Sequence, residues 1–159
     1  MRKLSLTIAL AVGIGLAVTS VALADHGIHG PKTLKLIDVS DKFEFVDVGA
    51  PAQSEGDFGP GDMLLFDNIL RNRTDTNDVG RFVSACTMGA SPGIALCRGT
   101  LLLEKGTIEL STTVDFANAD TIVTAVTGGT GRYRNVHGVA ILAEEVREGA
   151  RKLTVFLQP

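Results

Sequence analysis

The sequence predicts an all-β protein, a single closed antiparallel β-barrel of about eight strands, on three observations. Short segments rich in Val, Ile, Leu, Thr and Phe recur between Gly, Asn, Asp and Pro residues. The apolar residues of the main part of the chain show almost no helical period. Some segments carry apolar residues on both faces, as expected when one face lines a closed interior and the other is covered. A two-sheet sandwich is the alternative.

The chain begins with a segment typical of a secretory leader. A positively charged start precedes an almost uninterrupted apolar run, which ends at the small residues Ala22-Leu23-Ala24. Signal peptidases cleave after such residues, and no second apolar run of spanning length follows. We therefore predict a signal peptide over residues 1–24 and one secreted, extracytoplasmic domain over residues 25–159. An uncleaved membrane anchor is the alternative.

The exported domain is acidic. The whole chain has a formal net charge of −3, and the leader carries the basic Arg2 and Lys3 but no acidic residue. Removal of the leader therefore makes the remaining domain more negative. This charge balance argues against nucleic acid and against an anionic membrane surface as partners.

Strands are expected where β-branched and aromatic residues alternate with polar ones or form short apolar runs. The expected segments are 33–39, 43–48, 62–72, 79–88, 94–104, 107–116, 121–127, 137–146 and 153–157. Residues 50–60, between the second and third segments, are rich in Gly and Pro and lack periodicity. They are predicted to form a mobile connection within the domain.

The two cysteines of the chain lie on either side of a predicted turn at residues 89–93. If the flanking segments form a hairpin, Cys86 faces Cys97 and Phe82 faces Leu101, on one apolar surface. Because exported cysteines are usually oxidised, we predict a disulfide between them. A reactive thiol is the alternative.

A second hairpin is predicted at Lys105-Gly106, a two-residue turn between two strand segments. The segment after this turn alternates apolar residues such as Ile108 and Leu110 with polar residues such as Glu109. One face of this strand is therefore expected to be buried and the other exposed to solvent.

Three sequence blocks, in this order and spacing, carry a resemblance to a known family. They are Gly61-Asp62-Met63-Leu64-Leu65-Phe66-Asp67-Asn68-Ile69-Leu70, Val79-Gly80-Arg81 and Gly128-Gly129-Thr130-Gly131-Arg132-Tyr133-Arg134. Together they resemble the allene oxide cyclase and dirigent barrel family. The resemblance implies a calycin-like barrel, often trimeric in plants, with an apolar cavity that holds a reactive small molecule while it cyclises or couples. A homo-oligomer, either a dimer or a trimer, is therefore an expectation.

The same resemblance suggests cavity residues. Asn68 and Cys86 match an asparagine and a cysteine that line the cavity of the cyclases, whereas Leu36 stands where their glutamate is expected. Asp38 resembles a first-strand aspartate of dirigent proteins. His137 replaces an arginine that follows their Gly-rich hairpin.

We predict Asp38 and His137 as catalytic residues, because a carboxylate and an imidazole can move protons. The predicted ligand-binding residues are those expected to reach the cavity. They are Phe66, Asn68, Phe82, Leu101 and Arg134. The alternative for the polar residues Asp38, Asn68, Arg134 and His137 is that they face solvent or stabilise a turn.

Two further motifs have simpler interpretations. The Gly-rich run at 127–131 lacks the following helix that a phosphate loop needs, so we interpret it as a hairpin. His26 and His29, close to the mature start, could bind copper or nickel, but a flexible tail accounts for them. We therefore predict no metal site and no cofactor.

The leading hypothesis is a secreted barrel that binds a small apolar molecule in its interior. It would act as a cofactor-independent isomerase or cyclase, or as a dirigent-type stereochemical guide, by confining a reactive conformer. A non-catalytic exported carrier or protein-interaction module on the same barrel is the alternative. The missing cavity glutamate is consistent with that alternative.

Overall fold

The computed structural model describes residues 32–48 and 58–159. The predicted leader, the two histidines near the mature start, and residues 49–57 of the predicted connection lie outside the described residues. In the described ranges, no helix has the length and the apolar character that crossing a membrane requires.

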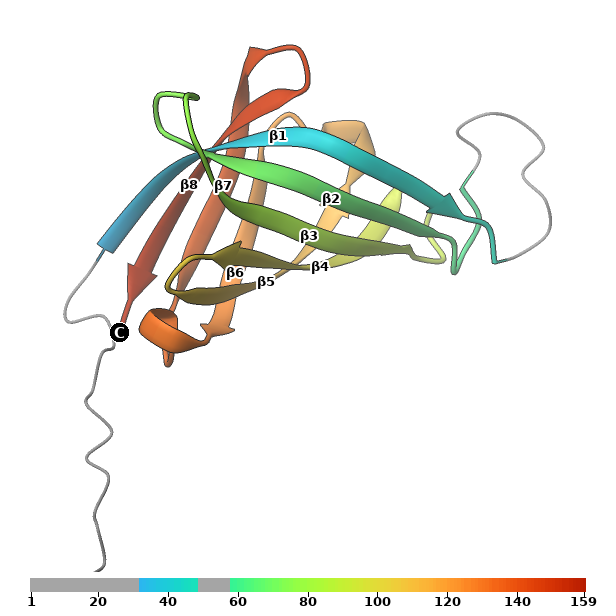
Figure 1. The fold of residues 1–159 in the computed structure, drawn as a ribbon. Helices are drawn as coiled ribbons and strands as arrows, with labels where there is room; N and C mark the ends of the chain where they lie inside the picture. The colour runs from blue at the N-terminus through green and yellow to red at the C-terminus, as the bar shows by residue number, and fades with distance from the viewer. Residues whose placement is uncertain (1–31, 49–57) are drawn as a thin grey trace, which may run out of the picture.

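The described residues form a closed antiparallel barrel in which each strand pairs with its neighbours in sequence and the last strand returns to the first (Figure 1). The strands are β1 (Lys32–Val46), β2 (Met63–Asn72), β3 (Asp78–Met88), β4 (Ile94–Leu103), β5 (Gly106–Asp115), β6 (Ile122–Gly129), β7 (His137–Arg147) and β8 (Ala150–Gln158). Two short 3-10 helices follow β5 and β6, namely η1 (Phe116–Asn118) and η2 (Gly131–Tyr133). The predicted all-β closed barrel is confirmed, and the two-sheet sandwich is wrong.

The first two predicted segments, 33–39 and 43–48, are one continuous strand, β1. The pairing of β1 with β2 shifts between Val39 and Lys42, which marks a bulge. On the other edge of β1, the backbone N–H of Ser40 donates to a carbonyl in the β7–β8 turn at 2.8 Å. The polar run at this point is therefore a bend within a strand, because hydrogen bonds to both neighbours keep the backbone extended.

Both predicted hairpins are confirmed. In the first, Cys86 pairs with Cys97 and Phe82 pairs with Leu101, in the predicted register. A disulfide joins the two cysteines across β3 and β4. In the second, the turn is Glu104-Lys105 rather than the predicted Lys105-Gly106, because Leu103 pairs with Gly106. Gly106 opens β5 at a φ of 136°, a conformation that favours glycine.

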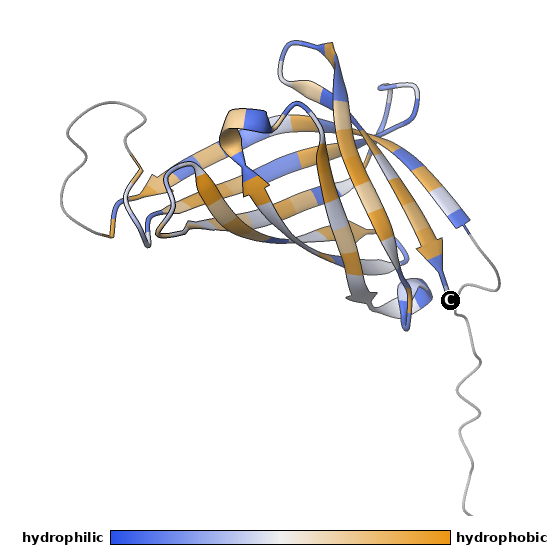
Figure 2. Cartoon of the chain, turned by 180° about the vertical axis from the view of Figure 1, so that it is seen from behind, coloured by the Kyte–Doolittle hydropathy of each residue, from blue (hydrophilic) through white to orange (hydrophobic). Residues whose placement is uncertain are grey.

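Two clusters of buried side chains fill parts of the barrel interior. The larger comprises Leu70, Leu101, Ile108, Leu110, Val126, Tyr133, Val136, Ala140, Leu153, Val155 and Leu157. The smaller comprises Leu64, Cys86, Met88, Ala95, Cys97 and Val114. Figure 2 shows hydrophobic and hydrophilic residues alternating along the strands, which is the pattern that sends one residue inward and the next outward. Burial of these apolar side chains supplies most of the stabilisation.

One buried carboxylate holds both ends of the connection between β1 and β2. The backbone N–H of Val48 donates to Oδ1 of Asp62 at 3.0 Å, and that of Gly59 donates to Oδ2 at 2.7 Å. The flanks of residues 49–57 are therefore fixed next to each other at the start of β2.

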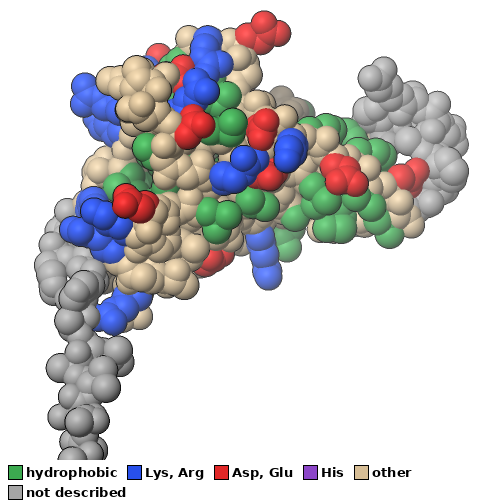
Figure 3. All heavy atoms as spheres, in the orientation of Figure 1, with side chains coloured by type: hydrophobic (Ala, Val, Ile, Leu, Met, Phe, Trp, Pro, Cys, Tyr) green, Lys and Arg blue, Asp and Glu red, His purple; other side chains and the backbone are tan. Residues whose placement is uncertain are grey.

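Ion pairs join neighbouring segments on the outer surface. Arg81 in β3 contacts Asp67 of β2 at 2.6 Å and Asp41 of β1 at 2.8 Å. Arg147 in β7 contacts Asp75 in the β2–β3 turn at 2.8 Å. On the face seen in Figure 3, basic and acidic side chains are interspersed. Because solvent screens such pairs, they add little to stability beyond what the interior supplies.

Candidate functional site

A cavity of about 300 Å³ lies inside the barrel, bordered by members of both buried clusters. Leu110 and Leu153 come from the larger cluster, and the disulfide comes from the smaller one. Several lining positions carry small side chains, among them Ser84, Gly99 and Ala140. An eight-stranded barrel has room for either packed side chains or one small ligand, so small residues at these positions leave space for a ligand.

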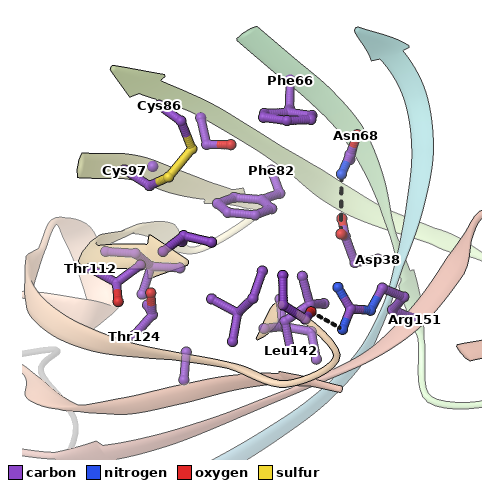
Figure 4. Close-up of a pocket in the computed structure, with 18 of the residues that line it drawn as sticks. Asp38, Phe66, Asn68, Phe82, Cys86, Cys97, Thr112, Thr124, Leu142 and Arg151 are labelled. Carbon is purple, nitrogen blue, oxygen red and sulfur yellow. Dashed lines mark hydrogen bonds between the residues drawn. A yellow bond between two sulfur atoms is a disulfide. The ribbon is translucent and has the colours of Figure 1, made fainter. Parts of the chain in front are cut away.

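A buried carboxyl is the main polar feature of the cavity wall. Asp38 in β1 is only 5% exposed, and the Nδ2 of Asn68 in β2 donates to its Oδ2 at 3.1 Å (Figure 4). The other carboxyl oxygen, Oδ1, is buried and has no hydrogen-bond partner within the described part of the chain. Because buried polar atoms are normally satisfied, this oxygen is a site where a bound molecule could donate a hydrogen bond.

The environment of Asp38 brings its titration close to neutral pH. Burial raises the pKa of the Asp38 carboxyl to about 6, while the hydrogen bond from Asn68 and the charge of Arg151 partly oppose the rise. A carboxyl with such a pKa can take up a proton and release it again near neutral pH. The group is therefore suited to moving a proton within a bound molecule.

Arg151 lies beside this carboxyl. It occupies the position of β8 directly opposite Asp38 in the β1–β8 ladder. Its Nη2 donates to the carbonyl oxygen of Ala119 at 3.1 Å and to that of Asp120. Arg151 therefore holds the segment after η1 against the cavity, where Phe116 and Ala119 form part of the lining.

Aromatic side chains form much of the remaining wall. Phe66, Phe82 and Phe116 all line the cavity. Figure 4 shows the carboxyl–amide pair on one side and the disulfide on the other, with the rings of Phe66 and Phe82 between them. The hydroxyl-bearing Thr112 and Thr124 also line the cavity. A flat, largely apolar molecule with a polar edge would fit these surroundings.

Four of the predicted site residues line the cavity and three do not. Those that line it are Asp38, Phe66, Asn68 and Phe82. Leu101 is fully buried in the larger cluster, and Arg134 lies at the end of η2. His137 is exposed at the start of β7, because the alternate residues of that strand point inward, as the buried Ala140 shows. The structure therefore does not bring His137 together with Asp38.

Arg151 is a cavity residue that the sequence pattern did not predict. The last strand was expected at 153–157, whereas β8 begins at Ala150 and includes this arginine. Arg151 shares the inward face of β8 with Leu153 and Val155. The sequence did contain a sign of this position. Arg151 stands two residues before the alternating apolar run that begins at Leu153, and residues two apart on a strand share a face.

Asp38 is the one carboxylate among the residues that line the described cavity. Within residues 32–48 and 58–159, no group of three or more His, Cys, Asp or Glu side chains is arranged to hold a metal ion. The polar side-chain groups of the residues that line the described cavity are therefore a carboxyl, an amide, two guanidiniums and a few hydroxyls. Of the two arginines, Arg98 is exposed.

Replacing Gly99 by Ala is expected to reduce the cavity. A Cβ at this position would lie 2.5 Å from Cε2 of Phe82 and 2.8 Å from Cβ of Ser84, so the ring would have to move. Overpacking of this kind costs about 1 to 3 kcal/mol of unfolding free energy. Urea denaturation of the purified variant measures this cost.

A matched control is Gly59→Ala. There an added Cβ would meet only Asp62 atoms at 3.5 Å or more, which is ordinary contact. The control should unfold like the parent protein. If Gly99→Ala also unfolds like the parent, the wall around Phe82 is looser than the structure shows.

No protein-family model and no curated protein sequence matches the chain. Among solved structures, a pyocyanin demethylase is similar at a TM-score of 0.66 and 26% identity, covering 80% of this chain and 100% of that one. A pterocarpan synthase dirigent protein matches at a TM-score of 0.61 and 16% identity, covering 80% and 93%. A Diels-Alderase from Streptomyces koyangensis matches at 0.64 and 15% identity, covering 80% of this chain but 63% of its own. At such identities the last two matches show a shared fold alone.

Proposed function

We propose that the interior of this barrel, whose fold is that of dirigent proteins and Diels-Alderases, binds a small, largely apolar molecule and catalyses or guides a reaction of that molecule without a cofactor. The observation that carries the proposal is the buried carboxyl of Asp38, a residue that lines the aromatic cavity and whose Oδ1 has no hydrogen-bond partner among the described residues. Such a group is costly to stability unless a ligand uses it.

The proposed chemistry is an isomerisation or cyclisation by proton transfer. The Asp38 carboxylate takes a proton from one atom of the bound molecule and returns it to another atom of the same molecule, so no oxidant or reductant is consumed. Asn68 holds the carboxyl in one orientation through Oδ2. The nearby positive charge of Arg151 would stabilise negative charge that develops on the molecule.

The similar structures support a catalytic or guiding role for this kind of barrel. By their names, one is a demethylase, one is a dirigent protein and one is a Diels-Alderase. Each of these names describes chemistry on a small organic molecule. The function of the present chain is proposed to belong to this class.

Secretion and self-association complete the proposal. The Cys86–Cys97 disulfide is compatible with a location outside the cytoplasm. Large apolar side chains exposed on the outside of the described barrel, such as Leu96 and Phe156, are consistent with the expected homo-oligomer.

The test is to offer the protein candidate ligands and to follow whether they change. Pyocyanin is the first compound to try, because the similar structure at 26% identity is that of a pyocyanin demethylase. Small-molecule extracts follow, with bound and altered compounds identified by mass spectrometry. Once a converted compound is found, Asp38→Asn is expected to lower its turnover by about 10² to 10⁴-fold while the compound still binds.

A non-catalytic carrier is the second candidate function. It is favoured by the exposed position of His137, which leaves the cavity without the second predicted proton-transfer residue. A compound that is recovered bound but unaltered, with equal affinity for the parent and the Asp38→Asn variant, would favour the carrier over the enzyme.

A further inference from the structure

The wall of the cavity presents a hydrogen-bond acceptor and a hydrogen-bond donor on neighbouring strands. Asp38 and Arg151 are register partners in the β1–β8 ladder, and both line the cavity. No ion pair joins them in the described part of the chain. Arg151 instead donates through Nη2 to the carbonyl oxygens of Ala119 and Asp120. Two opposite charges thus lie side by side without neutralising each other directly.

Each of these groups has hydrogen-bonding capacity that its contacts among the described residues do not use. Asn68 occupies Oδ2 of Asp38, and Oδ1 is left without a partner. Both hydrogen bonds of Arg151 use Nη2, whereas its guanidinium has donors on three nitrogen atoms. A buried, unpaired carboxylate oxygen beside unused guanidinium donors matches a ligand edge that donates one hydrogen bond and accepts another.

The apolar part of the cavity indicates the frame on which this edge is carried. A dry cavity of about 150 Å³ holds one benzene molecule, so the present volume of about 300 Å³ suits a frame of two fused rings. Phe66, Phe82 and Phe116 in the wall favour a flat ring system, because aromatic rings stack or meet edge to face.

We infer that the cavity selects a flat, two-ring molecule whose edge carries a hydrogen-bond donor next to an acceptor, as in a lactam or another cyclic amide. The donor would bond to Oδ1 of Asp38, and the acceptor would take a hydrogen bond from the guanidinium of Arg151. This inference rests on the proposed function, since it names the class of molecule that the same cavity would bind.

Three small molecules of nearly equal shape test it. Oxindole has an N–H beside a carbonyl, 2-indanone keeps the carbonyl but has CH₂ in place of N–H, and indane has neither. Binding of each to the full exported domain is measured by isothermal titration calorimetry. Oxindole is expected to bind about tenfold or more tightly than 2-indanone, and 2-indanone more tightly than indane, because hydrogen bonds to buried charged groups are the strong ones.

Two variants then assign the edge to the two residues. Arg151→Gln should reduce the preference for 2-indanone over indane, because a neutral amide donates a weaker hydrogen bond than a guanidinium. Asp38→Leu should remove the preference for oxindole over 2-indanone. Lys152→Gln is the control for charge, because Lys152 lies next in sequence but pairs with Glu144 on the exposed side. Its preferences should equal those of the parent. Far-ultraviolet circular dichroism checks that each variant is folded.

The outcomes separate the inference from the function on which it rests. If all three molecules bind equally well to the parent protein, the inference is wrong, but the proposal of a cavity for small apolar molecules stands. If none of them binds, the proposed cavity function fails together with the inference. These comparisons use the parent protein, so they hold even if Arg151→Gln fails to fold.

Discussion

Asp38→Asn is expected to raise the free energy of unfolding by about 3 kcal/mol at about pH 8. Burial raises the pKa of the Asp38 carboxyl from 3.8 to about 6 in the folded protein, and a pKa difference of about one corresponds to about 1.4 kcal/mol. Because the folded pKa is the higher one, the unfolded chain loses this proton first as the pH rises. The charged carboxylate therefore destabilises the fold fully above about pH 6, progressively less between pH 6 and 4, and not at all below that range.

Urea denaturation at several pH values measures this effect. The gain of the Asp38→Asn variant over the parent should be largest at about pH 8 and should vanish at about pH 3. Glu104→Gln, on the exposed turn between β4 and β5, is the control and should change little at either pH. A variant that is less stable than the parent at pH 8 would mean that the carboxylate has a favourable partner in the folded protein.

A variant that is more stable but inactive would also locate the function. Groups that serve a ligand are often kept at a cost to the stability of the free protein. A gain in stability from Asp38→Asn, together with the loss of turnover expected above, would show that Asp38 is retained for chemistry rather than for folding.

Loss of the disulfide is expected to lower the free energy of unfolding by about 3 kcal/mol. The bond joins Cys86 and Cys97, which are separated by 11 positions in sequence, and closing a loop of about a dozen residues in the unfolded chain accounts for ~3 kcal/mol. Both cysteines are also buried, so their replacement by Ala removes packed atoms from the smaller cluster. Urea denaturation of the Cys86→Ala, Cys97→Ala double variant measures the loss.

Reduction provides the matching experiment. The parent protein, refolded in a reducing agent, should be destabilised by a similar amount, whereas the double variant should not respond to the reducing agent. Because the disulfide also lines the cavity, the double variant should bind ligands differently from the parent. Equal stability of the oxidised and reduced parent would mean that the β3–β4 hairpin and the barrel around it hold without the bond.

The local features of the barrel follow from the sequence because they depend on residues close together in the chain. A two-residue turn fixes the register of β4 and β5, and the sequence locates this turn to within one residue, since it predicts Lys105-Gly106 and the structure has Glu104-Lys105. In the β3–β4 hairpin, the turn-forming residues at 89–93 and the shared inward face of Cys86 and Cys97 are sufficient to predict which residues pair. In these elements the alternation of apolar and polar residues and the turn residues support the same register.

The bulge in β1 could not be predicted in this way. Ser40 and Asp41 interrupt the alternation, and a break between two strands explains that pattern as well as a bulge does. The neighbouring strand β8, at the far end of the chain, supplies hydrogen bonds along the first half of β1. The bulge also changes which side of the sheet the later residues of β1 face, so that Phe43 pairs with the inward Phe66.

The sequence by itself determined the all-β class, the two hairpins and the disulfide, whereas the inward positions of Asp38 and Asn68 were expected only from the family resemblance, with a solvent position as the alternative. Only the tertiary structure decided that Arg151 lies beside Asp38, that His137 lies outside the cavity, and that a space remains between the two clusters. The physical reason is that the first and last strands meet only when the barrel closes. Their register depends on the stagger of every strand between them, and no single local turn determines the total stagger around the barrel.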